Sequence, residues 1–241
     1  MFSVGEVFGK AWQNFKDNMG VSLIAAFAYF SLTGIINIFI SVAGTIVIEI
    51  TGGNFVFQVL DFVFQQVVSV VVTAYFMKGF LVFSLRIIRG EPGRVEDLFA
   101  RNDLYFPMLL AMILITIGTM VGLIFLIIPG LLFMLFTSFT YWFVIDEEME
   151  PIAAMKASFT ALKPNIWPYI LYGFLSICVY LLGFLACCVG IFVAFPVTFF
   201  AMGHIYLAIK DSGGTTILNP NGPPKRFDEP ERSITTENPP W

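Results

Sequence analysis

The chain has 241 residues, of which 58% are hydrophobic and only 12% are charged. A soluble domain typically carries about 25% charged residues, so these proportions exclude a soluble fold and indicate that lipid covers part of the surface. The net charge of −4 comes without a long basic run or an RNA-binding pattern. This argues against a nucleic-acid partner and leaves the lipid bilayer as the expected environment.

Four continuous apolar blocks occupy most of the chain, at residues 20–48, 54–85, 104–145 and 166–209. About 20 helical residues cross the roughly 30 Å hydrocarbon core, so the last two blocks are each long enough for two spans. Turn signals divide them near Pro129-Gly130 and near Cys187 to Gly190. We therefore predict an all-α polytopic membrane domain, residues 1–210, with six transmembrane helices near 20–48, 55–83, 105–128, 130–146, 166–187 and 189–209.

The basic residues determine the predicted orientation. With the N-terminus in the cytoplasm, all 13 Lys and Arg residues fall on the cytoplasmic side or at the inner end of a span. The three outer turns, near 49–54, 129–130 and 187–190, contain none. Under the positive-inside rule, this placement predicts a multi-pass protein of the cytoplasmic (inner) membrane with both termini in the cytoplasm.

Short amphipathic segments are expected to precede each pair of spans and to lie in the cytoplasmic interface. Two of them repeat the same apolar spacing, with Phe8, Ala11, Trp12 and Phe15 in the first and Met155, Ser158, Phe159 and Leu162 in the last. A shorter segment from Val95 to Arg101 echoes Val4 to Lys10. The chain therefore reads as three units, each a short helix followed by a two-span hairpin, although amphipathic helices can also resemble one another by chance.

Residues 211–241 differ from the rest of the chain, with six prolines and few apolar residues. Such a sequence cannot bury a core, so we predict a disordered cytoplasmic tail. Proline lowers the entropy that an extended segment loses on binding, and Trp is enriched at binding hot spots. Trp241 is therefore the predicted anchor for a protein partner; the alternative is a tail that binds nothing.

Several short motifs, in this order, carry a resemblance to a known family. They are Arg89-Gly90-Glu91, the segments from Val95 to Phe99, Leu126 to Gly130, Val144 to Glu147 and Ala154 to Ser158, and the closing Pro196 and Tyr206. Together they resemble the YciC-like proteins and the membrane domain attached to some glycerophosphodiester phosphodiesterases, over roughly residues 3–209. The resemblance implies six helices and a location in the cytoplasmic membrane. It implies no activity, and it does not imply phosphodiesterase activity for this chain, because the sequence shows no phosphodiesterase catalytic domain.

Little in the sequence points to catalysis. Metal sites need clustered His, Cys or carboxylates, but the chain has one histidine, His204, which we interpret as interfacial or hydrogen-bonded within the bundle. The pair Cys187-Cys188 fits packing near a helix end better than lipidation or redox chemistry. The acidic run at 146–150 fits a solvated start for a helix from Pro151; binding of a cation or a basic partner is the alternative. Without a phosphate-binding loop or a nucleophile elbow, we expect neither an enzyme nor a cofactor.

The second span carries one polar face, formed by Gln58, Asp61, Gln65 and Ser69. Asp61 lies within an apolar block, and a charge at membrane depth usually faces a bundle interior or a water-filled cavity. We expect all four side chains to face other helices or a cavity; the plainer interpretation is an interfacial carboxylate with helix-packing amides. The predicted function is an accessory, scaffolding or envelope-homeostasis component that acts through protein partners. The alternative is a transporter or lipid carrier that uses this polar face.

Overall fold

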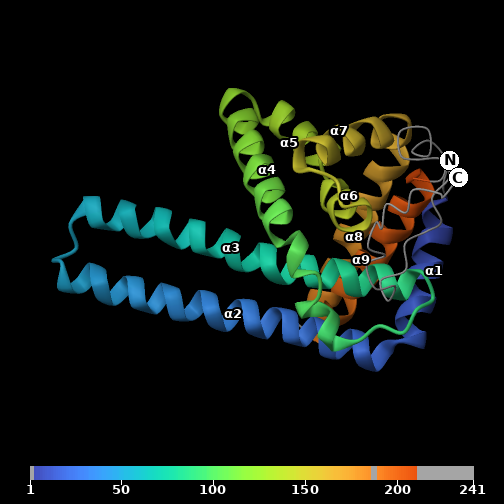
Figure 1. Cartoon of the computed structure of the whole chain (residues 1–241), viewed down its shortest axis with the longest axis horizontal. Helices are drawn as coiled ribbons and strands as arrows, with labels where there is room; N and C mark the ends of the chain where they lie inside the picture. Colours follow the sequence, from blue (N-terminus) through green and yellow to red (C-terminus); the bar gives the residue numbers. More distant parts are fainter. Residues whose placement is uncertain (1–2, 186–188, 211–241) are drawn as a thin grey trace, which may run out of the picture.

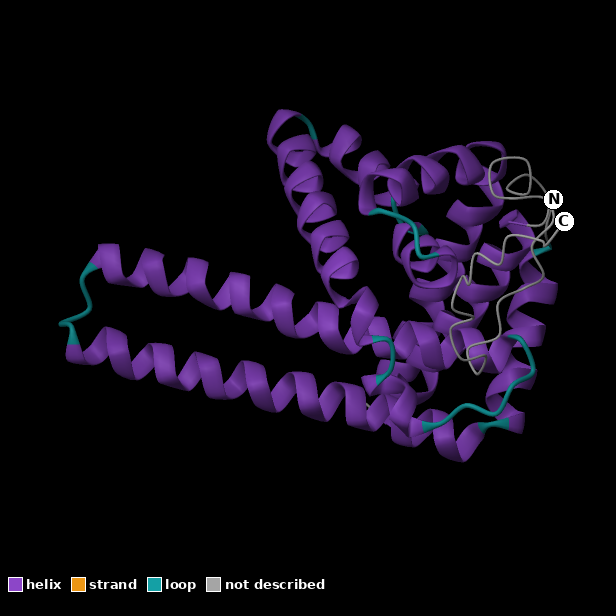
Figure 2. Ribbon diagram, in the orientation of Figure 1, coloured by secondary structure: helices purple, strands orange, loops and turns teal. Residues whose placement is uncertain are grey.

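The computed structural model describes residues 3–185 and 189–210, and every regular element in these ranges is a helix (Figures 1 and 2). The α-helices are α1 (Val4–Asp17), α2 (Met19–Ile50), α3 (Phe55–Ile88), α4 (Tyr105–Phe125), α5 (Ile127–Phe136), α6 (Thr140–Glu147), α7 (Pro151–Leu162), α8 (Ile166–Leu185) and α9 (Val189–Ile209). Short 3₁₀ helices are η1 (Val95–Phe99), η2 (Asn102–Leu104) and η3 (Lys163–Asn165). Six helical segments are long and apolar enough to cross a membrane, which confirms the all-α polytopic prediction.

The turn predicted at Pro129-Gly130 lies three residues earlier, at Leu126, whose backbone is extended (φ −166°, ψ 141°). Pro129 instead occupies the first turn of α5, where its missing N–H leaves no helical hydrogen bond unmade. Gly130 lets α4 and α5 pack closely: a Cβ added at Gly122 of α4 would lie only 2.7 Å from the Gly130 Cα of α5. Proline and glycine therefore belong to the α4–α5 hairpin without forming its turn.

The span predicted as one helix at 130–146 is two helices, because the chain turns between α5 and α6. Ser158, from α7, bonds the backbone exposed by this break. Its hydroxyl donates to the Phe136 carbonyl at 2.7 Å and accepts from the Phe139 N–H at 3.1 Å. A non-helical backbone is tolerated at membrane depth when protein groups satisfy its hydrogen bonds.

The helices follow the predicted order of three units. The first unit is α1 with the α2–α3 hairpin, the second is η1 and η2 with α4 to α6, and the third is α7 with the α8–α9 hairpin. Each leading helix packs against the last helix of the preceding unit: η1 on α3, α7 on α6, and α1 on α9. Because α1 closes onto α9, the packing is cyclic. This arrangement supports the predicted triplication.

The leading helices differ from the amphipathic face that the sequence predicted. In α1 the buried side chains are Val4, Val7, Ala11 and Phe15, whereas Trp12 is 47% exposed. The second leading segment is a 3₁₀ helix whose Asp97 and Leu98 are buried. Its backbone presses so closely on α3 that a Cβ at Gly79 would overlap the Leu98 carbonyl. The segment is therefore packed into the protein and does not lie free in the interface.

The last helices of the three units, α3, α6 and α9, meet in the core, where Trp142 of α6 stacks on Tyr206 of α9 with ring centroids 5.7 Å apart. The inner half of α3 is buried there, while its outer half lies in a hairpin with α2 that projects beyond the other helices (Figure 1). The α4–α5 hairpin points in a different direction (Figure 1). The apolar hairpins are thus joined to one another at the ends that lie in the core.

Candidate functional site: an ion-pair hub

Each unit ends with an isoleucine followed by a charged residue. These pairs are Ile88-Arg89 after α3, Ile145-Asp146 in the last turn of α6, and Ile209-Lys210 after α9. The isoleucines help to anchor the helix ends, and Ile145 and Ile209 are both buried in the core. The packing of α3, α6 and α9 therefore brings three charges together from distant parts of the chain.

Asp146 is the centre of this hub, which we define as Arg89, Asp146, Tyr206 and Lys210. Its side chain is 1% exposed. Oδ1 accepts a hydrogen bond from Arg89 Nη2, and Oδ2 accepts from Tyr206 Oη and from Lys210 Nζ, both at 2.8 Å. Both oxygens of the carboxylate are thus occupied by donors from the two neighbouring units.

The two cations of the hub compensate the charge of the Asp146 carboxylate. A buried carboxylate is expensive unless it is paired and hydrogen-bonded, and Asp146 meets both conditions. Burial alone would lower the pKa of Lys210, but the pairing with Asp146 and with Glu147 outweighs it, so the pKa of Lys210 is raised. The hub therefore remains charged at neutral pH and ties the ends of α3, α6 and α9 together.

A second set of ion pairs connects the ends of α3 and α6 to the segment between α3 and α4. Arg86 pairs with Asp97 of η1 at 3.4 Å, and the Asp97 carboxylate accepts from the Arg94 N–H at 2.9 Å. Arg101 pairs with Glu148 at 2.8 Å. These contacts fix the start of the second unit against both the first unit and its own end.

Arg101 and Glu148 both have left-handed backbones, with φ of 53° and 54°. This conformation is uncommon outside glycine, and it persists where surrounding contacts hold it. Here the two residues hold each other through their ion pair. The chain thereby turns sharply at the two ends of the second unit.

The acidic run is predicted as a solvated start for the helix after it, and this is wrong for Asp146 and Glu147 but agrees with the exposed Glu148 and Glu150. Asp146 is buried within α6, and Glu147 and Glu148 form ion pairs with Lys210 and Arg101. The helix starts where it is predicted, with the exposed Glu150 as its N-cap and Pro151 at its first position. The repeated isoleucine-charge pair at the three unit ends was the signal that could have revealed the hub.

Only part of the predicted polar face of α3 lies against another helix. Gln65 donates to Asp61 at 2.6 Å, and both are half-buried beside α2, where a Cβ at Gly44 would overlap the Asp61 carboxylate. Ser69 is half-buried on the same side, but Gln58 is exposed and donates to the Gly53 carbonyl at 2.9 Å. Asp61 also borders an apolar groove of about 520 Å³ between α2 and α3.

The other candidate residues form no reactive cluster. His204 lies in α9 with Nε2 3.0 Å from Asn14 Nδ2 of α1, so it joins the first and third units. Within residues 3–185 and 189–210 no group of three His, Cys, Asp or Glu side chains could hold a metal ion. Cys187, Cys188 and Trp241 lie outside the described residues.

The fold and the hub define an all-α polytopic membrane protein built from three hairpin units that join at a buried ion-pair centre. Over 235 residues the chain is 25% identical to Uncharacterized protein Rv2560 of Mycobacterium tuberculosis, a match that covers 90% of this chain and 70% of that protein. Uncharacterized protein Mb2590 of Mycobacterium bovis matches to the same extent. No family model and no solved structure matches the chain. The resemblance to YciC-like proteins therefore stays a prediction.

Proposed function

We propose that this chain is a non-enzymatic component of the cytoplasmic (inner) membrane that acts through protein partners, in an accessory, scaffolding or envelope-homeostasis role. The observation that supports this is the hub. A general acid or base must exchange a proton with a substrate within hydrogen-bond reach, whereas both oxygens of Asp146 are taken by donors within the protein. The hub therefore fits a structural centre that holds three hairpins in a defined arrangement.

The proposed orientation keeps both termini in the cytoplasm. The ion pairs support a common side for the ends of α3, α6 and α9, and the positive-inside rule assigns that side to the cytoplasm. Cysteines introduced at Thr51 and Ser212 test it, since a membrane-impermeant thiol reagent should label them from opposite sides. Labelling from the same side would contradict the orientation.

The proposed partner contact is the tail, with Trp241 as its anchor, because a proline-rich segment binds in an extended form with little loss of entropy. Deletion of 213–241 should leave membrane insertion intact and reduce the recovery of co-purifying proteins in mild detergent. Trp241→Ala should reproduce much of that loss. If the truncated protein retains every partner of the full chain, the tail is not the contact.

A second candidate is a transporter or lipid carrier, favoured by the groove of about 520 Å³ with Asp61 as its one charged residue. Purified protein in proteoliposomes would then move a substrate by itself, and Asp61→Asn, which keeps the shape of the side chain, should slow the flux. Asp103→Asn is the matched control, because Asp103 is an exposed carboxylate outside this groove. Flux that survives Asp61→Asn unchanged would count against a role for the polar face.

A further inference from the structure

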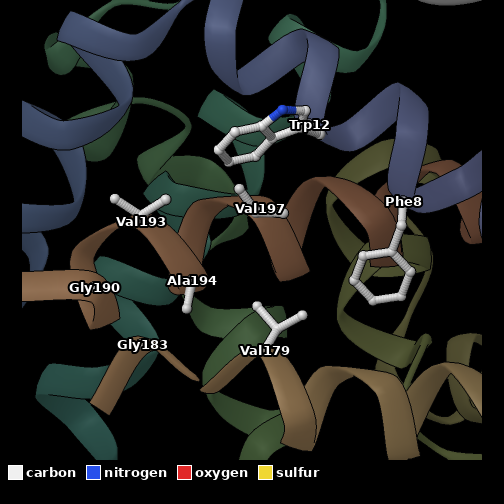
Figure 3. Close-up of a pocket in the computed structure, with 8 residues that line it drawn as sticks. All are labelled: Phe8, Trp12, Val179, Gly183, Gly190, Val193, Ala194 and Val197. Atoms are coloured by element: carbon white, nitrogen blue, oxygen red, sulfur yellow. The ribbon is translucent and has the colours of Figure 1, made fainter. Parts of the chain in front are cut away.

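Two apolar grooves lie at corresponding places in two of the units. The first, of about 450 Å³, lies between α1 and the α8–α9 hairpin, where Phe8 and Trp12 face Val179 and Val193 (Figure 3). The second, of about 410 Å³, lies between the start of α4 and the α2–α3 hairpin. In both cases a leading segment and the hairpin of the preceding unit form the walls. Their volumes fall in the range of about 300–1,000 Å³ typical of small-ligand sites.

The correspondence extends to single positions. Val193 in the first groove stands at the same sequence distance from Lys210 as Val72 in the second stands from Arg89. Val197 and Phe76 correspond in the same way. A packing defect would not be expected to recur at corresponding positions of two sequences that differ this much. The recurrence indicates that the architecture forms the groove each time.

Along α1 the first groove changes from apolar to aromatic to basic, which matches a phospholipid from its acyl chain to its headgroup. Phe8, Trp12 and Lys16 follow one another at four-residue intervals along α1, so they form one stripe on the helix. Figure 3 shows Trp12 over Val197, with the indole nitrogen on the ring edge away from the apolar wall. Trp at the border of an apolar site is typical of the membrane interface. Lys16 is exposed one turn further on.

The second groove has a positive charge behind its wall. Lys78 is fully buried and contacts two groove residues: Nζ donates to Asn102 Oδ1 at 2.7 Å and lies 4.4 Å from the centre of the Tyr75 ring. Among the described residues it forms no ion pair with a carboxylate. The nearby Asp103 is paired with Arg101. A buried cation without an anionic partner is unfavourable, so this site attracts an anion.

Asn102 can relay that attraction. An ammonium group only donates hydrogen bonds, so the Asn102 atom that faces Lys78 must be the oxygen. The amide nitrogen is then turned away from Lys78, on an exposed residue at the groove, and makes no hydrogen bond within the described part of the chain. It is a donor positioned for a phosphate or carboxylate oxygen.

We propose that each groove binds one acyl chain of an anionic phospholipid, with the phosphate near Lys16 in the first groove and near Asn102, in front of Lys78, in the second. The lipids fill the space between a leading segment and the hairpin before it. This inference is independent of the proposed partner function, because it depends only on the grooves and their charges.

Native mass spectrometry of the full chain in mild detergent tests the proposal with phosphatidylglycerol as the probe and phosphatidylcholine as the neutral comparison. We expect two tightly bound phosphatidylglycerol molecules per chain. Phosphatidylglycerol should bind roughly fivefold more tightly than phosphatidylcholine, which is the preference that one basic residue at a membrane surface confers. Val193→Phe and Val72→Phe fill corresponding positions, so each should remove one lipid and the double variant both.

The controls are Leu182→Phe on α8 and Val63→Phe on α3, which introduce the same phenyl ring on exposed surfaces outside the two grooves. They should keep both lipids. Lys16→Gln should weaken the preference for phosphatidylglycerol at the first groove alone. If Val193→Phe and Val72→Phe bind as many lipids as the unmodified chain, or if the two lipid types bind equally, the proposal is wrong.

Discussion

Replacing Asp146 by asparagine should destabilise the protein strongly. The amide keeps the size of the side chain but removes the negative charge that Arg89 and Lys210 share. Arg89 would then face a neutral group, and Lys210 would keep only its pair with Glu147, in a region where the Asp146 side chain is 1% exposed. Breaking a buried ion pair by removing one partner typically costs about 3–5 kcal/mol.

The low end of that range applies, because Arg89 and Lys210 retain 14% and 22% exposure and water screens part of the remaining charge. A loss of about 3 kcal/mol lowers Tm by roughly 6–12 °C for a chain of this size, at about 2–4 °C per kcal/mol. Thermal unfolding of the purified protein in one fixed detergent, followed by the fluorescence of its tryptophans, measures this shift. Trp142, which packs on Tyr206 in the core, reports on the hub region directly.

The matched control is Glu148→Gln, which removes a carboxylate from the same acidic run. Glu148 pairs with Arg101, but its side chain is 40% exposed. Exposed ion pairs contribute at most about 1 kcal/mol, so the control should shift Tm by only a few degrees. If Asp146→Asn unfolds within about 2 °C of the unmodified chain, the hub does not hold the three units together.

Three further predictions concern the hub and the break between α5 and α6. Tyr206→Phe removes one donor to Asp146 and should destabilise by about 1.5–3 kcal/mol, the usual value for a hydrogen bond to a charged group, in the same unfolding assay. Ser158→Ala leaves the buried Phe139 N–H and the partly buried Phe136 carbonyl without their partner and should lower stability by about 1–3 kcal/mol, whereas Ser158→Thr should retain more of it. The raised pKa of Lys210 predicts a pH dependence, because such a group stabilises the fold below its unfolded pKa of 10.5 and loses that effect as pH rises through the higher folded value. Stability should therefore fall above pH 10.5 in the unmodified chain and fall less in Lys210→Gln.

The number of membrane-spanning segments could be predicted from the sequence because it depends on local composition. A run of apolar residues long enough to cross the membrane must satisfy its own backbone, and a helix does so within one segment. The three-unit order was also visible, since the leading segments share short motifs such as Val4 to Lys10 and Val95 to Arg101. Both signals lie within short windows of sequence.

The hub could not be predicted in the same way, because its contacts join distant positions. Arg89 and Asp146 are 57 residues apart, and Asp146 and Lys210 are 64 apart. Read locally, the acidic run beside Pro151 resembles an ordinary helix start. The break between α5 and α6 was missed for a related reason, since no proline or glycine marks it and Ser158 supplies its hydrogen bonds from another helix.

The hub requires unlike charges at the ends of the three units. If the units were identical, their packing would bring three like charges together, and like charges in a poorly solvated site repel one another. Arg89, Asp146 and Lys210 instead alternate in sign, and Glu147 adds a second negative charge beside Lys210. The isoleucines before them stay the same because they serve packing, which tolerates repetition. The three units therefore share the apolar residue at their ends and differ in the charged residue after it, because the buried centre requires charges of opposite sign.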